Sequence, residues 1–319
     1  METLEELQKP EKSISTVKLA VSVIIPVRNE ARNLPRCLQA LRDVGEVYVI
    51  DSQSSDETVE IARSHGVQVV QFHYQGGWPK KRQWAMDNLP IANDWIFLLD
   101  ADEILTPALA EEIAQAIQNP RVDGYAILLR IDFLGRELRH GDVGLWKLSL
   151  FRRGKGRYEC RLKDQDVSMA DMEVHEHVVV DGVTAKLQNP LTHHNVDSLS
   201  RYIRKHDEYS NWESRVLLHG RDDGHDGGDH SGLPPSLWGN QAQRRRWLKR
   251  QFYVLPGSPV LLFLYRYILR LGFLDGMPGL IYCGFQAVQM FHTKAKIFEL
   301  KLRKNKRTEN RNRGIEIRQ

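Results

Sequence analysis

Two carboxylates stand one residue apart at the end of an apolar run, in the stretch WIFLLDADE over residues 95–103. The run is typical of a buried parallel strand, which would place Asp100 and Asp102 at the carboxyl edge of a sheet, where open α/β sheets bind ligands. Alternate residues of a strand point to the same side, so both carboxylates can converge on one hard cation, Mg²⁺ or Mn²⁺. We therefore interpret the stretch as a metal and diphosphate site. An isolated D-x-D is more often a strand followed by a polar turn, so the surrounding sequence decides.

A second group of residues that could bind a ligand is the basic run Lys80, Lys81 and Arg82, which follows the loop QGGW. Residues 79–89 are predicted to form a helix, and the three cations then lie in its first turn. Cations at that end interact unfavourably with the helix dipole, and a bound anion would offset this unfavourable free energy. The alternative is a solvated basic helix start.

The elements that would position these groups alternate between strand and helix along the first third of the chain. Buried strands are predicted at 21–26, 46–51 and 67–72, and the second one also ends in a carboxylate, Asp51. Helical patterns separate them, at 33–42 and 54–65. Successive strand, helix, strand units imply right-handed crossovers and a parallel sheet.

The later elements are predicted from the same patterns. They are a helix at 107–118 capped by Thr106, strands at 125–131, 148–151 and 178–181, the stretch 191–195 with two histidines, and a long helix at 198–218.

Composition sets the class of protein. The chain has 319 residues, of which 41% are hydrophobic and 27% charged, and its mean hydropathy is −0.45, which excludes a polytopic membrane protein. The three cysteines are far apart and form no C-x-x-C pair, which favours a reduced cytosolic protein without structural zinc. The first residues lack an apolar core, so we expect no signal peptide.

The order of these patterns predicts one α/β domain with a C-terminal extension. The expected divisions are an N-terminal tail at 1–18, the α/β domain at 19–219, a flexible Gly, Asp and His rich linker at 220–239, an amphipathic helical extension at 240–300 and a basic tail at 301–319.

The extension contains apolar, aromatic runs that are broken by Arg266, Arg270 and Asp275, and none reaches the ~20 uncharged residues that span a bilayer. Such stretches suit helices that lie in a membrane interface. The alternative is a helical hairpin that packs on the α/β domain or on a second copy of the chain, as in a homodimer.

Four motifs together resemble the family 2 glycosyltransferases, an inverting group with the GT-A fold. They are VSVIIPVRNEARNL at 21–34, VIDSQSSDET at 49–58, GGWPKKRQWAM at 76–86 and DADE at 100–103, supported more weakly by VHEH at 174–177 and LTHH at 191–194. The resemblance implies a GT-A, Rossmann-like nucleotide-binding sheet that is mainly parallel. Within the family the sequence is most similar to bacterial enzymes that add sugars to lipopolysaccharide core or to lipid-linked polysaccharide precursors.

The resemblance also implies site residues. The nucleotide sugar, which we expect to be a UDP sugar, would be held at its base and ribose by Pro26, Val27 and Glu30 of the first loop. Asp51 would accept from the uracil N–H, with Ser54 and Asp56 shaping its loop. Lys80 or Arg82 would contact the diphosphate, and Asp100 would contact the ribose or a metal-bound water. Asp102 would hold Mg²⁺ or Mn²⁺ directly, which neutralises charge on the leaving UDP.

Inverting transfer needs a carboxylate that deprotonates the attacking hydroxyl. The family pattern favours Glu176 in VHEH, with Glu173 as the alternative and Asp164 or Asp166 as further candidates. His193 would be the third metal ligand, with His194 as the alternative. No apolar run of the sequence is long enough to form a transmembrane channel, so we expect transfer of a single sugar rather than polymerisation.

The expected partners follow from this assignment. They are a nucleotide sugar, a lipid-linked or saccharide acceptor and a membrane surface bound through 240–300 on the cytoplasmic face of the inner membrane, without nucleic acid. Two other functions remain as alternatives: a non-catalytic nucleotide-binding membrane scaffold, and a phosphatase of the haloacid dehalogenase type. The latter places its first Asp on the first strand, whereas DADE closes a later one.

Overall fold

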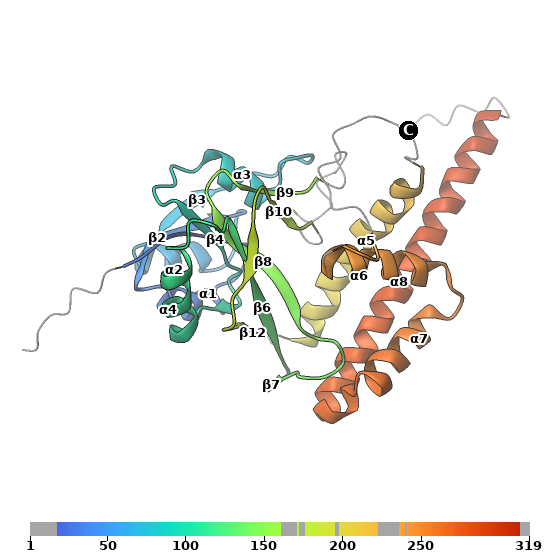
Figure 1. Cartoon of the computed structure of the whole chain (residues 1–319). Helices are drawn as coiled ribbons and strands as arrows, with labels where there is room; N and C mark the ends of the chain where they lie inside the picture. Colours follow the sequence, from blue (N-terminus) through green and yellow to red (C-terminus); the bar gives the residue numbers. More distant parts are fainter. Residues whose placement is uncertain are drawn as a thin grey trace, which may run out of the picture.

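The computed structural model describes residues 18–160, 171, 176–194, 198–222, 236–239 and 241–312. Within these residues one sheet has the strand order β3-β2-β1-β4-β8-β6-β12-β5, with β7 and β11 also paired to β6, and β9 and β10 form a separate pair (Figure 1). The strands are β1 (Leu19–Val27), β2 (Val44–Asp51), β3 (Gln68–Gln71), β4 (Trp95–Leu98), β5 (Glu103–Ile104), β6 (Gly124–Phe133), β7 (Arg136–Glu137), β8 (Leu145–Arg152), β9 (Gly156–Tyr158), β10 (Val178–Val180), β11 (Thr184–Lys186) and β12 (Leu191–His194).

The first half of the sheet is parallel and carries helices on both faces. Strands β3, β2, β1 and β4 run in the same direction. Alternate residues of β1 enter different cores: Val23 packs with α1 (Leu34–Gln39), α2 (Thr58–Ser64) and α4 (Pro107–Ala116), while Ile24 packs with α3 (Lys81–Asn88). This two-sided burial explains why the strands are continuous apolar runs.

The structure confirms the predicted α/β class and the strands and helices of this half, with boundaries that move by a few residues. Thr106 caps α4 as expected, since its Oγ1 accepts from the Leu109 amide at 3.2 Å. Prolines occupy the first turns of α1 and α4, where a missing N–H has no cost.

The second half of the sheet is mixed, because β8 lies between β4 and β6 and is antiparallel to both. A tight reversal through β7 and residues 138–144 returns the chain next to β4. Strand β6 is thereby parallel to β4, and its C-terminal end lies at the same edge as Asp100. The sequence predicted strands here but not their order, since the pairing partners are distant along the chain.

The C-terminal part of the chain is helical. It comprises α5 (Leu199–Asp222), α6 (Gln241–Val254), α7 (Ser258–Leu264), a π-helical turn η1 (Tyr265–Leu269), a 3₁₀ turn η2 (Gly272–Asp275) and α8 (Gly276–Asn312). Helix α5 packs along α8, and the two stand beside the sheet (Figure 1). Helix α8 continues beyond residue 300, where we expected the basic tail to begin. None of the described helices is long and apolar enough to span a bilayer.

Candidate active site

The carboxyl edge of the parallel strands brings the first two loops together. Val27 lies opposite Asp51 at the ends of β1 and β2. The loops are bound to each other, because the Asn29 amide donates to Ser54 Oγ at 2.8 Å and the Glu30 amide donates to the Thr58 hydroxyl at 2.8 Å. These bonds hold the backbone that the sequence assigned to the base and ribose.

Asp51 is buried at this edge and has a fixed orientation. Its carboxylate accepts from the Ser54 hydroxyl at 2.5 Å, from the Ser54 amide at 3.1 Å and from the Gln71 side chain at 2.9 Å. Ser54 therefore positions Asp51 and the first loop at the same time. A contact of Asp51 with a nucleobase stays a prediction.

The three cations at the start of α3 are almost completely buried, and each one is paired with a different carboxylate. The pairs are Lys80 with Glu176 (Nζ to Oε2 3.4 Å), Lys81 with Asp171 (Nζ to Oδ2 3.1 Å) and Arg82 with Asp100. At most 5% of each basic side chain is exposed. Burial, more than any neighbour, lowers the pKa of Lys81. The basic helix start thus meets anions, but the ones present are protein carboxylates.

Asp100 is held between two cations rather than left open to solvent. Lys147 on β8 donates to Asp100 Oδ2 at 2.9 Å and to Glu103 Oε1 at 2.8 Å, and Arg82 contacts the other oxygen of Asp100. Burial by itself would raise the pKa of Asp100, but Arg82 and Lys147 together hold it well below its usual range. Burial raises the pKa of the fully enclosed Glu103. Sequence reasoning missed Lys147; the signal was a lone cation within the apolar strand LWKLSLF.

Asp102 meets His193, which strand β12 brings beside β5. His193 and Glu103 are paired in the β12–β5 ladder, and His193 Nε2 lies 3.1 Å from Asp102 Oδ2. Burial would raise the pKa of Asp102, but His193 outweighs it and lowers this pKa to about 2. In the same way burial would lower the pKa of His193, but Asp102 raises it. The two candidate metal ligands, 91 residues apart by their numbers, are therefore in contact.

The donor atoms of this pair fit a divalent cation. Two ligands at right angles and about 2.1 Å from a metal ion are roughly 3 Å apart, close to the separation found here. The described residues contain no group of three or more His, Cys, Asp and Glu side chains suited to metal. Two protein ligands are nevertheless sufficient for Mg²⁺ or Mn²⁺ when substrate phosphates and water complete the coordination shell.

Glu176, the predicted base, is buried beside Lys80 with no exposed side-chain surface. Lys80 also lies 5.4 Å from the ring centroid of Trp212 on α5, so the pair is covered by that helix. The alternatives Glu173, Asp164 and Asp166 lie outside the described residues. Residue 194 ends β12, but the structure does not describe the position of its side chain.

Helix α5 supplies residues that sequence reasoning did not assign to the site. Arg201 Nη2 contacts Glu30 Oε1 at 2.6 Å, and Lys205 lies one turn further along. Tyr209, 5.9 Å from Lys205 by its ring centroid, and the carboxylates of Asp102 and Glu30 raise the pKa of Lys205. Arg201, Lys205 and Tyr209 are spaced four residues apart and therefore lie on one face of the helix, a pattern that the sequence already contained.

The arrangement joins a loop pair suited to a nucleoside, a ligand pair suited to a divalent cation, and a cationic helix face above them. Such a set can bind a nucleotide diphosphate through its charge and stabilise negative charge that develops on it.

Comparison with known proteins gives consistent results. The family model described as Glycosyl transferase family 2 matches residues 22–179. The lipopolysaccharide core biosynthesis glycosyltransferase LpsC of Rhizobium meliloti (strain 1021) is 27% identical over 298 residues, which cover 90% of this chain and 96% of that protein. An uncharacterized glycosyltransferase of Rickettsia bellii (strain RML369-C) is 35% identical over 106 residues, which cover 33% and 35%.

Two solved structures are similar to this chain at low sequence identity. The mannosyltransferase PcManGT from Pyrobaculum calidifontis, in complex with GDP-Man and Mn²⁺, has 15% identity and a TM-score of 0.48, covering 88% of this chain and 87% of that one. TarS 1-349 of S. aureus, in complex with UDP-GlcNAc, has 14% identity and a TM-score of 0.44, covering 84% and 91%.

Proposed function

This chain is a family 2 glycosyltransferase, and from that premise we propose that it transfers one sugar, with inversion, from a UDP sugar to a hydroxyl of a lipid-linked or lipopolysaccharide-type acceptor. The observation that carries the proposal is the contact between Asp102 and His193 at the same sheet edge as Asp51.

On the donor side, the proposal assigns the uracil N–H to Asp51 and the ribose to the first loop. The hydrogen bonds to Ser54 keep the Asp51 carboxylate oriented before the donor arrives, which reduces the entropy lost on binding. Of the two cations considered for the diphosphate, Lys80 has no exposed surface and Arg82 has little. We therefore add Lys205, on the helix face above Asp102, as a cation for the leaving diphosphate.

Asp102 and His193 would hold Mg²⁺ or Mn²⁺, and the ion would stabilise the charge that develops on the leaving UDP. Asp100 takes a supporting role, because Arg82 and Lys147 occupy its oxygens. Together with Glu103 these residues fix the turn that carries Asp102.

On the acceptor side, we assign the general base to Glu176. The Lys80 ammonium lies 3.4 Å from Glu176 Oε2 and holds this carboxylate in position, and a carboxylate is a group that can accept the proton of an attacking hydroxyl. Because Glu176 is covered by α5, an acceptor hydroxyl reaches it only if that cover opens. Binding of the acceptor at this helix would supply the opening.

The acceptor class is supported by LpsC, whose name describes lipopolysaccharide core biosynthesis and which aligns with nearly the whole chain. A second support is the apolar surface of residues 260–277, which spans α7, η1, η2 and the start of α8. Ten large apolar side chains there are between 38% and 74% exposed: Val260, Leu261, Leu264, Tyr265, Ile268, Leu269, Leu271, Phe273, Leu274 and Met277.

The charged residues within this apolar surface are mainly basic. The sequence from 255 to 298 contains one acidic residue, Asp275, and it is buried against His140 at 3.0 Å. Arg266 and Arg270 lie in the same stretch. Arg270 Nη2 is 3.7 Å from the partly exposed carboxylate of Asp142, which comes from outside this stretch. An apolar surface with arginines among its side chains suits a bilayer of anionic lipid, and we place it on the cytoplasmic face of the inner membrane.

Donor and metal binding test the proposal directly. UDP sugars with Mn²⁺ should raise the thermal stability of the full chain, because a ligand that binds only the folded state stabilises it by mass action. Asp102→Asn should remove the Mn²⁺-dependent part of this shift and lower transfer by roughly 100- to 1000-fold. Asp94→Asn, at a carboxylate that is 83% exposed, is the control and should change neither. A metal requirement unchanged in Asp102→Asn would refute the assignment, and donor binding without any turnover would favour the scaffold.

A further inference from the structure

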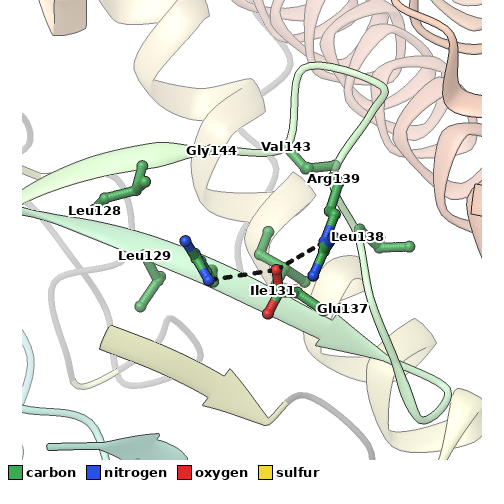
Figure 2. A pocket seen from close by; sticks show the side chains of 9 residues that line it. Leu128, Leu129, Ile131, Glu137, Leu138, Arg139, Val143 and Gly144 are labelled. Atoms are coloured by element: carbon green, nitrogen blue, oxygen red, sulfur yellow. Dashed lines mark hydrogen bonds and ion pairs between the residues drawn. The ribbon is translucent and has the colours of Figure 1, made fainter. Parts of the chain in front are cut away.

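A pocket of about 430 Å³ opens on β6 and the segment that follows it (Figure 2). We name it the β6 pocket. Its apolar lining comes from Leu128, Ile131, Leu138 and Val143, and its polar lining from Arg130, Glu137 and Arg139. The volume falls in the range of small-molecule sites, which combine apolar walls with a few polar groups.

The polar groups of the β6 pocket carry an excess of positive charge. Glu137 Oε1 lies 3.6 Å from Arg130 Nη1 and 3.2 Å from Arg139 Nε, so one carboxylate serves two guanidinium groups (Figure 2). The two arginines are 47% and 73% exposed. Each guanidinium has five N–H donors in a planar fork, which matches the oxygens of a phosphate or a carboxylate.

The strand that carries the β6 pocket lies beside the strand that carries His193. Ile131 of the pocket is paired with His193 in the β6–β12 ladder, and His193 is paired with Glu103 in the β12–β5 ladder. Neighbouring strands are about 4.8 Å apart, so the pocket strand is about 10 Å from the strand that follows Asp102. Arg130 is paired with Thr192 in the β6–β12 ladder, so its side chain points to the opposite face of the sheet from His193, and an acceptor reaches both by passing the carboxyl edge of β6 and β12.

The other wall of the β6 pocket is attached to the apolar surface of 260–277. The Gly141 amide donates to the Arg270 carbonyl at 2.8 Å, and Arg266 Nη1 donates to the Gly141 carbonyl at 3.3 Å. The Asp275 carboxylate accepts from the Arg139 amide at 3.0 Å. The segment that closes the β6 pocket is therefore in direct contact with the surface that we assign to the membrane.

We propose that the β6 pocket is an acceptor subsite that binds a phosphate or carboxylate group carried by the acceptor saccharide. The inference rests on the proposed function, since it requires an acceptor that enters from the apolar surface toward Asp102. Arg130 and Arg139 bind the anionic group, and Leu128 and Val143 contact the apolar face of the sugar ring.

Calorimetric titration of the full chain with glucose 6-phosphate and with glucuronate tests the subsite, with glucose as the neutral probe. The charged sugars should bind at least ~10-fold more tightly than glucose, and R130A/R139A should remove that difference. Glu137→Gln should change affinity in the opposite direction, a gain of roughly threefold, because it releases both guanidinium groups. A damaged fold cannot produce a gain. Arg153→Ala, at an arginine that is 51% exposed and 3.6 Å from Asp94, is the matched control and should leave binding unchanged.

Three results would overturn the subsite: equal binding of glucose and the charged sugars, no effect of R130A/R139A, or weaker binding in Glu137→Gln. Vesicles with anionic lipid separate the two sources of an anionic group. R130A/R139A should bind them as the unchanged chain does, and an equal loss of vesicle binding would assign the pocket to lipid headgroups instead. If the proposed function itself fails, the unchanged chain will not bind a UDP sugar with Mn²⁺, whatever the sugar titrations show.

Discussion

The candidate active site and the apolar surface of 260–277 depart from the usual distribution of side chains in opposite ways. At the sheet edge, charged groups are inside: Lys80, Lys81 and Glu176 have 1% or less of their side chains exposed. On the apolar surface, large hydrophobic groups are outside, with Leu269 74% exposed. Ionised groups are rarely buried and apolar patches of this size are rarely exposed in a monomer, because both states cost free energy.

We infer that each of the two regions binds a partner outside the chain, and that the two partners differ in chemistry. The buried ions are partly neutralised by one another, which leaves the Asp102 and His193 pair and the cationic face of α5 for an anionic donor. The apolar surface has no such internal compensation, which is why we propose a bilayer as its partner, with a second copy of the chain as the alternative. The segment that closes the β6 pocket is attached to the helical segment of this surface through the bonds of Gly141 and Arg139.

The largest effect should come from breaking a buried pair at the sheet edge. Lys81→Met leaves Asp171 buried without its cation, and removing one partner of such a pair typically costs about 3–5 kcal/mol of unfolding free energy. Urea unfolding measures the change. Arg42→Met is the control, since the Arg42 and Asp43 pair is exposed and an exposed pair contributes about 0–1 kcal/mol. Equal losses in both variants would mean that burial does not distinguish the charges at this edge.

The second prediction concerns Glu176, the carboxylate that we assign as the general base for the acceptor, and its expected effect is on turnover rather than on stability. Glu176→Gln should lower turnover by about 100-fold and leave the affinity for the donor largely unchanged, because only the proton acceptor is lost. Initial rates and donor-induced thermal shifts measure the two quantities separately. Loss of donor affinity and turnover together would assign Glu176 a structural role beside Lys80. Turnover close to normal would return the role to Glu173, Asp164 or Asp166.

The smallest effect should come from one side chain of the apolar surface. Leu269→Glu replaces an exposed apolar side chain of the proposed membrane-binding surface with a carboxylate, which should weaken binding to vesicles of anionic lipid by roughly 10-fold. Co-sedimentation measures this, and Val183→Glu, at an aliphatic residue that is 59% exposed and far along the sequence, should have no effect. If vesicle binding is unchanged while light scattering shows a dimer dissociating, the apolar surface binds a second copy of the chain.

Part of the fold and of the candidate site was accessible from the sequence. The strands, the helices and the cap at Thr106 follow from local patterns, and the structure confirms them. The position of Asp51, Asp100 and Asp102 at one edge follows from parallel strands that each end in a carboxylate. These features depend on residues close in the chain, so their information is local.

The tertiary structure alone decided which charges meet. The sequence left open whether the basic helix start meets an anion or solvent. Only the fold pairs Lys80 with Glu176, 96 positions away, and brings Lys147 to Asp100 and Glu103. It also places the face of Arg201 and Lys205 above the donor edge and leaves the apolar surface uncovered. Pairing energies depend on distance and burial, which no local pattern contains, and the resulting partners determine which groups remain for the donor, the metal and the acceptor.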